Sequence, residues 1–496
     1  MIPHLVPLEF SRVQSYVKGF LEKEMTRIGL MTSISGNEIV LLLLDPVSSR
    51  SELVWTVLND KNYSSLAGQI PQLHWFERSI KDMFDLTPLN HPRLRSNFIQ
   101  NAFDSNLIPL SNDNEKDSGN SQRNFRFMKV FGEGIYEVPV GPVHAGIIEP
   151  GHFRLSCFGE YIQNLELRFG FLHRGLEKNI LRMPLQKMCF AAEAASSDTA
   201  CANALAHAMA IESILRIEVS KQDALCRNAA LELERAAMHI NDIGGMALDL
   251  GCLSVATTLS RLRGTVLGLA EQLTGSRLIR GYIKVGGVYF RPKPNFRELK
   301  KTIEDIEQEF TCIVNWFLEN AQVLERLSQV GKVSHNLAVD FGFVGVVARA
   351  SGIDYDVRKN FTTPSFPSDV HKVAHEKDGD CLARTRVRTY ELVNSLEILR
   401  FLFSELNEVN FECNQKSFLP DKLPTNSIAF GIVESFRGEL IHFIKTDDEG
   451  KIERYAIKDP SFNNWTGMAI CARGNLLADF PVCNKSFALS YSGHDL

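Results

Sequence analysis

VGPVHAGIIEPGHFRLS (residues 140–156), FGFLHRGLEKNILRM (169–183) and SSDTACANALAHAMAIE (196–212) form the stretch around which the rest of the chain is organised. It carries a dense set of ionisable side chains: His144, His152, Arg154, His173, Arg174 and Glu177. Glycines and prolines bracket the first loop and fix its path, because glycine permits unusual backbone angles and proline restricts them. Such a loop suits polar side chains that point into a cavity. The alternative is a surface turn with solvated histidines.

The composition is that of a globular protein with more than one domain. The chain has 496 residues, 44% hydrophobic and 23% charged, and a mean hydropathy of −0.09, which favours two or three cores. Its net charge of −5 leaves no basic surplus for nucleic acid. The most apolar run, IVLLLLDPV from Ile39, is too short to span a membrane, and the N-terminus lacks a signal-peptide pattern. We therefore expect a cytosolic chain unless a partner holds it against a membrane.

The ten cysteines include no pair in a CxxC spacing. Thiolate-bound zinc, iron–sulfur or nickel sites normally use at least one such close pair. In a large cytosolic protein the pattern therefore predicts buried free thiols.

The chain divides at a polar segment. Residues 9–28 predict an amphipathic helix, LMTSIS, EIVLLLL and ELVWTVL predict three strands, and WFERSIKDMFDL predicts a second helix. Residues 111–124 contain no large apolar side chain and predict a flexible linker. We expect a domain at 1–110, a linker at 111–126 and a second domain at 127–496.

The second domain is predicted to be mostly helical. Residues 222–242 carry an apolar stripe, and Gly244-Gly245 is expected to end that helix. A polar stripe one step round predicts either a functional face or a solvated one: Glu232, Arg235, His239 and Asp242. Residues 295–330 predict one long helix, and two strands flank the turn DDEG near the C-terminus.

Two resemblances cover most of the chain. HWFERSIKDMFDLTPLNHPRLR (74–95) resembles the signature of the smaller peripheral subunit of respiratory complex I, which packs beside the large one. Further along, several motifs follow the order seen in the quinone-site subunit of complex I and in the large subunit of energy-converting nickel–iron hydrogenases: GPVH, HRGLEK, ALAHAMAIE, ALDLG, YIKVGGV, RASGIDYDVRK, ESFRGEL and DPSFNNW. The two parts are fused in this order in hydrogenases of the formate-hydrogenlyase type, as in the fused C/D subunit of NADH-quinone oxidoreductase. The resemblance implies an α+β fold, with a small α+β domain before a mostly α-helical large-subunit-like domain with peripheral strands.

The resemblance also implies where metal ligands would stand. In the hydrogenase branch four cysteines in two CxxC pairs hold nickel and iron. The flanking motifs align these positions with Ser196, Thr199, Ser490 and Gly493. Hydroxyls and a glycine cannot replace thiolate sulfur around soft, low-valent nickel and iron. We therefore expect no bound metal and no hydrogenase activity.

The complex I branch has lost the same cysteines and uses the cavity for quinone, with a histidine, an aspartate and a tyrosine at the headgroup. The aspartate aligns with Asp249, and the histidine with His144 or the nearby His152. The tyrosine aligns with Ser197, whose hydroxyl can hydrogen-bond a carbonyl but is too weak an acid to be the same proton donor. His152 could supply the proton instead.

Other ionisable residues are predicted to surround the cavity. Glu177 would share a face with His173 if that segment is helical, and could relay protons. We expect Arg154, His173, Arg349, Asp356 and Arg358 at the cavity wall. The last three, together with Asp354, belong to a predicted buried ion-pair network, and the alternative is that this network only stabilises the fold.

By resemblance, the chain occupies the catalytic-subunit position of a membrane-bound oxidoreductase related to complex I and energy-converting hydrogenases. The expected partners are a small iron–sulfur subunit of the complex I type, which carries a 4Fe-4S cluster, and ion-translocating membrane subunits. Electrons would pass from that cluster to a quinone or another acceptor at His144, His152, Glu177, Ser197 and Asp249, on the cytoplasmic side of the membrane. The alternative is a non-catalytic coupling or scaffold subunit.

Overall fold

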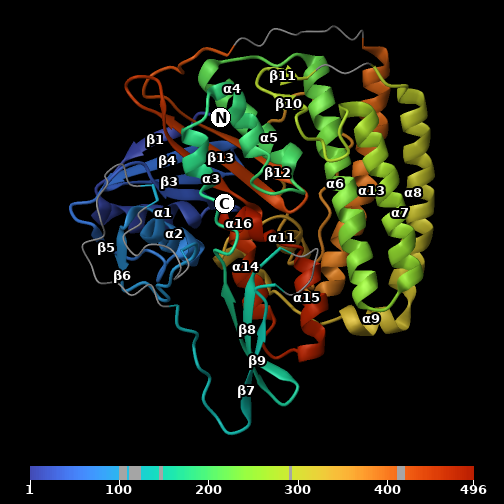
Figure 1. The fold of residues 1–496 in the computed structure, drawn as a ribbon, viewed down its shortest axis with the longest axis horizontal. Helices are drawn as coiled ribbons and strands as arrows, with labels where there is room; N and C mark the ends of the chain where they lie inside the picture. The colour runs from blue at the N-terminus through green and yellow to red at the C-terminus, as the bar shows by residue number, and fades with distance from the viewer. Residues whose placement is uncertain (100–108, 111–124, 144–148, 290–292, 410–418) are drawn as a thin grey trace.

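A computed structural model describes residues 1–99, 109–110, 125–143, 149–289, 293–409 and 419–496. Figure 1 shows the N-terminal unit on one side, a central sheet, and four long helices standing side by side on the other. A small three-stranded sheet projects from the body. The expected α+β fold, with a mostly helical second part, is confirmed.

The N-terminal unit is built on a four-stranded sheet in the order β1-β4-β3-β2, in which only β1 pairs parallel. Its elements are β1 (His4–Pro7), α1 (Phe10–Leu21), β2 (Arg27–Ser33), β3 (Glu38–Asp45), β4 (Arg50–Val57), β5 (Asn62–Ser64), η1 (Pro71–Leu73), α2 (His74–Phe84) and β6 (Thr87–Leu89). The three predicted strands are confirmed. The apolar run from Ile39 lies in β3 and is buried on both faces, which explains its lack of alternation. The first helix ends at Leu21 rather than 28, because the chain from Arg27 pairs with β3.

The four long helices are α6 (Lys221–Asp249), α7 (Leu253–Thr274), α8 (Phe296–Glu319) and α13 (Cys381–Glu408). The predicted end of α6 at Gly244-Gly245 is wrong. A Cβ at Gly244 would lie 3.3 Å from the Leu259 Cβ, so this glycine serves the close packing of α6 on α7 instead. The single helix expected over 295–330 is also wrong. Asn320 adopts an extended conformation and its side chain caps α9 (Ala321–Leu327).

The central sheet consists of β12 (Ile428–Ser435), β13 (Gly438–Thr446) and β14 (Ile452–Lys458), all antiparallel. It confirms the strand pair predicted around DDEG. The buried helix α5 (Ala200–Leu215) packs on β12. Gly431 of β12 allows this contact, because a Cβ there would lie 1.8 Å from the carbonyl oxygen of Ala206.

The projecting sheet consists of β7 (Ile135–Val140), β8 (His152–Phe158) and β9 (Tyr161–Arg168). The remaining short elements are α3 (Leu176–Leu181), α4 (Leu185–Ala192), β10 (Ile283–Lys284), β11 (Gly287–Val288), α10 (His335–Asp340), α11 (Gly345–Ala350), α12 (Val357–Asn360), α14 (Pro460–Cys471), η2 (Leu477–Asp479), α15 (Phe480–Phe487) and α16 (Tyr491–Asp495). Several of these carry the candidate site between the central sheet and the long helices.

Buried side chains join the N-terminal unit to the rest of the chain. Arg27 of β2 donates to the Gly342 carbonyl oxygen at 2.7 Å and lies 3.3 Å from the Glu439 carboxylate. Arg454 of β14 donates twice to the Thr32 hydroxyl, at 3.1 and 2.8 Å. The division into domains at 1–110 and 127–496 stays a prediction, and the predicted linker at 111–124 lies outside the described residues.

Two further expectations concern the burial of the cysteines and the length of the apolar segments. Of the cysteines in the described part of the chain, seven are buried, Cys252 is half-buried and Cys312 is exposed, so the buried-thiol prediction is wrong for Cys312. Cys413 lies outside the described residues. Across the described ranges, the helices are too short or too polar to cross a bilayer.

Candidate functional site

The four positions aligned with metal ligands converge in space. Ser196 and Thr199 directly precede α5, whereas Ser490 precedes α16 and Gly493 lies within it. The hydroxyl oxygens of Ser196 and Ser490 are 3.0 Å apart and buried, although 294 residues separate them along the chain. The two former ligand pairs therefore still meet at one place, as their alignment requires.

An ion pair lies beside these hydroxyls. Arg437, in the turn between β12 and β13, donates to both carboxylate oxygens of Asp198 at 2.7 and 2.6 Å. Ser196 donates to the same carboxylate at 2.8 Å, and Arg437 also donates to the Ala488 carbonyl oxygen. Burial alone would raise the pKa of Asp198, but the Arg437 charge and these hydrogen bonds hold it below its usual value.

The residues at the former ligand positions do not fit a nickel–iron centre. Two serines, a threonine and a glycine supply no thiolate, and soft metals require one. A Cβ at Gly493 would lie 2.5 Å from an oxygen of the buried Asp459 carboxylate, so a longer side chain does not fit there without a shift of Asp459. We therefore derive no step through such a metal.

Two of the predicted quinone-site residues are accessible. Ser197 is exposed in the turn before α5, and Asp249 is exposed at the last position of α6. Partial loss of solvent around the carboxyl group raises the pKa of Asp249, and the positive charge of Lys485 opposes this shift. Asp249 lies two helical turns beyond Asp242, about 10 Å along the axis. Asp242 in turn is close enough to Asp198 and Arg437 for their charges to affect its pKa.

The histidines of the opening loop are placed differently. His144 lies outside the described residues. His152, the first residue of β8, is buried and its Nδ1 lies 3.1 Å from the Gly141 carbonyl oxygen. Burial, followed by the charges of Arg154 and Arg168, keeps its pKa low, so the ring is neutral at pH 7. Arg154 pairs with Glu137 at 2.8 Å.

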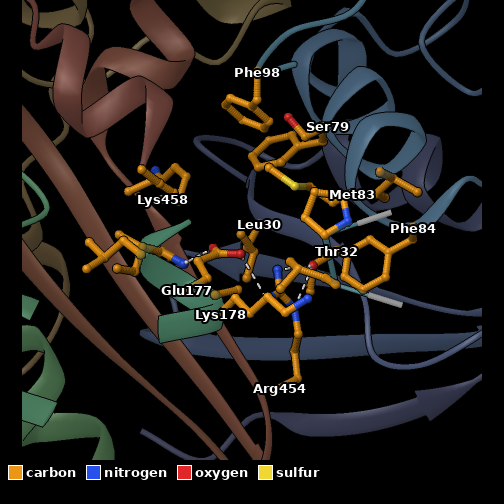
Figure 2. Close-up of a pocket in the computed structure, with 18 of the residues that line it drawn as sticks. Leu30, Thr32, Ser79, Met83, Phe84, Phe98, Glu177, Lys178, Arg454 and Lys458 are labelled. Atoms are coloured by element: carbon orange, nitrogen blue, oxygen red, sulfur yellow. Dashed lines mark hydrogen bonds and ion pairs between the residues drawn. The ribbon is translucent and has the colours of Figure 1, made fainter. Parts of the chain in front are cut away.

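His173 and Glu177 face a different cavity, between the N-terminal unit and the central sheet (Figure 2). Its volume is about 60 Å³ and its lining is mainly apolar. Glu177 pairs with Arg454 at 2.8 Å and accepts the backbone N–H of Ile457 at 2.9 Å. The expected shared helix face is wrong, because α3 begins at Leu176, after His173. These two residues therefore lie where the N-terminal unit meets the central sheet.

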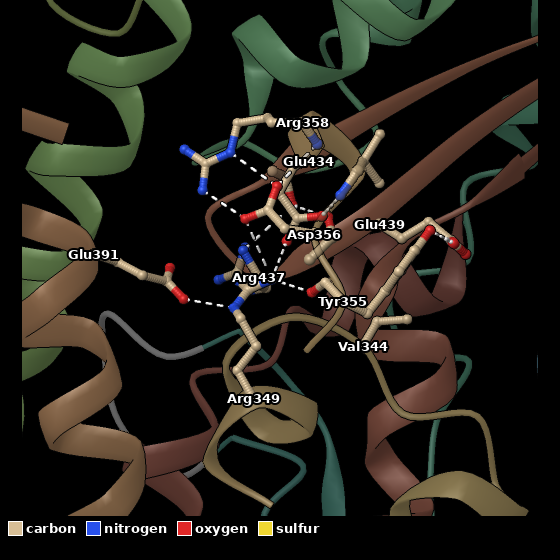
Figure 3. A network of polar contacts seen from close by, with 12 residues as sticks. Val344, Arg349, Tyr355, Asp356, Arg358, Glu391, Glu434, Arg437 and Glu439 are labelled. Atoms are coloured by element: carbon tan, nitrogen blue, oxygen red, sulfur yellow. Dashed lines mark hydrogen bonds and ion pairs between the residues drawn. The ribbon is translucent and has the colours of Figure 1, made fainter. Parts of the chain in front are cut away.

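Arg349, Asp356 and Arg358 form a buried ion-pair network, as predicted (Figure 3). The prediction is wrong for Asp354, which is exposed and pairs with Lys359 at 2.6 Å. Arg349 donates to Glu391 at 2.7 Å and to Glu434 at 2.8 Å, and lies 3.6 Å from Asp356. Arg358 binds both oxygens of Asp356, at 3.0 and 2.7 Å. The network connects α11, α12, α13 and β12 in the interior.

The polar stripe on α6 joins this network, and the solvated-face alternative is wrong. Glu232, Arg235, His239 and Asp242 are all buried. Glu232 accepts from Arg358 at 2.9 Å, and His239 Nε2 lies 3.0 Å from Glu391. The sequence of one helix does not show whether a row of charged residues on it is buried. That depends on the residues of other elements that pair with the row.

A buried hydrogen-bonded chain that sequence reasoning missed runs from one of the former ligand positions. The Asn203 amide donates to Thr199 Oγ1 at 3.0 Å, so its oxygen accepts from His442 Nε2 at 3.0 Å. Burial lowers the pKa of His442, and that of His207 to about 4, so both rings are neutral. His442 Nδ1 then accepts the Tyr455 O–H at 2.7 Å, and His207 Nδ1 donates to the Tyr455 oxygen at 2.8 Å. These hydrogen bonds fix the tautomer of each histidine.

Other missed residues were within motifs already noted. Arg437 and Glu434 belong to ESFRGEL, Asp459 to DPSFNNW and Asp198 to SSDTA. The charged side chains in these short motifs were the feature of the sequence that could have pointed to them. The hydrogen-bonded chain had no comparable signal, because its members lie on α5, β13 and β14 and meet only in the folded protein.

Glu234 on α6 predicts a pH-dependent stability. Its carboxyl accepts the backbone N–H groups of Cys201 and Ala202 at 2.7 and 3.2 Å, at the start of α5. Burial raises its pKa to about 8. Because the folded-state pKa is above the unfolded one, stability is highest below about pH 4.5 and falls as pH rises towards 8. Glu234→Gln keeps an acceptor oxygen and removes the titration.

We expect the thermal midpoint of Glu234→Gln to exceed that of the wild type by an amount that grows between pH 5 and pH 8.5. At the upper end the difference in the free energy of unfolding should reach a few kcal/mol, on the order expected for this pKa shift. Glu218→Gln, at an exposed glutamate, is the matched control. Its thermal midpoint should equal that of the wild type at every pH. Parallel pH profiles for the wild type and Glu234→Gln would contradict the assignment.

The fold and the sequence together define a class of subunit found in respiratory and hydrogenase complexes. Residues 249–430 and 421–495 match the family described as the 49 Kd subunit of respiratory-chain NADH dehydrogenase, and residues 15–119 match the 30 Kd subunit. The chain belongs to this complex I family and carries both parts in one polypeptide.

Its relatives come from both branches. It is 27% identical to formate hydrogenlyase subunit 5 of Escherichia coli (strain K12), over 88% of this chain and 77% of the relative. It is 29% identical to the C/D subunit of the NADH-quinone oxidoreductase of Bacteroides thetaiotaomicron, over 76% and 74%. A chain in the structure of the membrane-bound sulfane sulfur reductase, an archaeal respiratory membrane complex, matches with a TM-score of 0.68 and 26% identity, over 74% of this chain and 100% of that one.

Proposed function

We propose that the chain is the electron-transfer subunit at the catalytic-subunit position of a membrane-bound oxidoreductase related to complex I and energy-converting hydrogenases. It takes electrons from a 4Fe-4S cluster in a small iron–sulfur partner of the complex I type and passes them to a quinone or another acceptor. No nickel–iron centre takes part. Ion-translocating membrane subunits are its other partners, and it lies peripherally on the cytoplasmic side of the membrane.

The observation that carries this proposal is the convergence of the former ligand positions with oxygen donors only. The Ser196 and Ser490 hydroxyls meet at 3.0 Å, where relatives of the hydrogenase type would need thiolates. Hydroxyls can hydrogen-bond an organic acceptor but cannot hold a low-valent metal. The names of the relatives, which include quinone oxidoreductase subunits, support an acceptor of the quinone type.

Reduction of a quinone to a quinol requires two electrons and two protons. The electrons come from the partner's cluster. Asp249 supplies a proton, because its side chain is exposed and its pKa is raised, which keeps the acid form available nearer to neutral pH. Ser197 donates a hydrogen bond to a quinone carbonyl. Because Asp249 is exposed, solvent reprotonates it after the first transfer, and it supplies the second proton as well.

A coupling or scaffold subunit without its own redox reaction is the alternative. The Asp198–Arg437 pair and the Ser196–Ser490 contact favour it, because they occupy the space beside the former metal position with the chain's own side chains. The experiment below separates the two functions.

The test uses the intact complex with its cluster chemically reduced, and follows cluster reoxidation after addition of a soluble quinone. We expect rapid reoxidation in the wild type and roughly a hundredfold slower reoxidation in Asp249→Asn. Asp340→Asn is the matched control, because Asp340 is also the exposed last residue of a helix. Absence of reoxidation in the wild type, with the cluster intact, would exclude the quinone and favour the scaffold. Equal rates in both variants would exclude Asp249 as the proton donor.

A further inference from the structure

A second cavity, separate from the former metal position, is lined by an unusual number of arginines. Its volume is about 270 Å³, and it lies where the start of α2 meets β9 and the end of α14. Arg78 comes from α2, Arg93 and Arg95 follow β6, and Arg473 follows α14. Three of these arginines belong to the segment that resembles the smaller peripheral subunit of complex I, which the proposed electron-transfer role does not use.

Positive charge exceeds negative charge at this cavity. Among the described residues, Glu166 is the only carboxylate in ion-pair contact with the four arginines. It binds Arg93 and also Arg95, the latter at 2.5 Å. Asp82 acts on Arg78 from a distance, but its carboxylate already accepts the backbone N–H groups of Asn97 and Phe98 at 2.5 and 2.9 Å.

The pKa values of two of these arginines are lowered by burial and by the other arginines, because one carboxylate does not balance the positive charge of the group. Burial, and next the charges of Arg95 and Arg473, lower the pKa of Arg93 to about 10. The pKa of Arg78 is lowered to about 9, chiefly by burial, with Arg93 and Arg95 adding to the shift against Asp82. A bound anion would reverse both effects. The neighbouring His74 and His91 contribute no charge at pH 7, because burial lowers their pKa values to about 2 and 4.

The backbone and side chains hold the guanidinium groups in place. His91 Nδ1 accepts the backbone N–H of Arg93 at 3.0 Å, and its Nε2 lies 3.1 Å from the His74 carbonyl oxygen. Arg78 donates to the Arg95 carbonyl oxygen at 2.8 Å and lies 4.2 Å above the Trp75 ring. Arg473 is exposed at the mouth, so its guanidinium can turn to a ligand at little cost.

The rest of the lining is apolar and aromatic. Trp75, Phe125, Leu167 and Phe341 line the cavity with the arginines. The indole N–H of Trp75 donates to Thr466 at 2.7 Å, which fixes the ring. A site with a cationic mouth and a rigid aromatic wall selects an anion that carries an apolar or flat organic part.

We propose that this cavity binds a phosphate-bearing anion, with the phosphate held by Arg93, Arg95 and Arg473 and the organic part against Trp75 and Phe125. A planar guanidinium group can donate two parallel hydrogen bonds to two oxygens of one phosphate. A chloride ion, which is a single atom, cannot accept such a pair. The phosphate can belong to a soluble phosphate ester or to an anionic phospholipid at the membrane surface. The site is independent of the proposed acceptor site.

Calorimetric titration of the full chain with inorganic phosphate, against chloride at equal ionic strength, tests the chemistry. We expect saturable binding of phosphate that Arg473→Gln weakens about tenfold, because a charge-assisted contact is lost. Arg473 is exposed and makes no ion pair within the described residues, so this variant should fold normally. Arg277→Gln, an equally exposed arginine after α7, is the control and should bind as the wild type does.

Co-sedimentation with phosphatidylglycerol vesicles, compared with phosphatidylcholine vesicles, identifies the source of the phosphate. Binding to phosphatidylglycerol that Arg473→Gln weakens supports a lipid, and phosphate binding without vesicle binding supports a soluble ester. Absence of both kinds of binding overturns the proposal. Binding that Arg473→Gln and Arg277→Gln affect equally also overturns it.

Discussion

Replacement of Arg349 by methionine is expected to destabilise the folded chain by about 3–5 kcal/mol, because it leaves buried carboxylates without their counter-charge. Arg349 is fully buried and donates to Glu391 and Glu434 at 2.7 and 2.8 Å. Burial by itself lowers the pKa of its guanidinium, but these two carboxylates and Asp356 raise the pKa well above its usual value. Methionine replaces only the aliphatic part of the side chain, so the loss combines the charge, the hydrogen bonds and the volume of the guanidinium group.

The denaturant midpoint of the first unfolding transition, followed by circular dichroism, measures this effect. Arg326→Met is the control, because Arg326 pairs with Asp479 at 3.1 Å but its side chain is 48% exposed. A surface pair of this kind contributes no more than about 1 kcal/mol. Equal midpoint shifts for the two variants would show that the buried network does not stabilise the fold.

Gly431→Ala is the second substitution with a large expected effect. The added methyl group would lie 1.8 Å from the Ala206 carbonyl oxygen, which belongs to the backbone of α5 and cannot rotate away. The helix must move off β12, and we expect a loss of at least about 3 kcal/mol. Because α5 begins directly after Thr199, the same shift should disturb the former ligand positions and slow quinone-dependent cluster reoxidation.

Gly268→Ala provides the matched comparison within a helix. A Cβ at Gly268 of α7 meets no atom within 4 Å. Alanine there is expected to leave the thermal midpoint unchanged or to raise it, by up to about 1 kcal/mol of stability, since alanine favours the helix over glycine. If Gly431→Ala were as stable as Gly268→Ala, the close contact between α5 and β12 would be refuted.

The former ligand positions and the ion-pair network are both buried. The Ser196 and Ser490 hydroxyls meet beside the Asp198–Arg437 pair, and the network connects α6, α11, α12, α13 and β12 by charge. A change of charge in either cluster should act strongly on its neighbours, because charges interact more strongly in the protein interior than in water.

The sequence by itself determined the family, the two fused parts and the absence of cysteine at the aligned ligand positions. Linear motifs carry this information, because a run such as HRGLEK or ESFRGEL keeps its order whatever surrounds it. Three of the four strands of the N-terminal sheet and the hairpin at DDEG also followed from local apolar patterns and turn residues.

The tertiary structure alone decided how the ionisable residues are grouped. Glu177 and His173 were expected beside Asp249, but they face the junction with the N-terminal unit, where Arg454 is the partner of Glu177. Gly244-Gly245 was expected to end a helix, but the packing of α6 on α7 carries the helix on to Asp249. The physical reason is common to both: a charge or a glycine has its effect through the atoms that surround it, and those atoms come from distant parts of the chain.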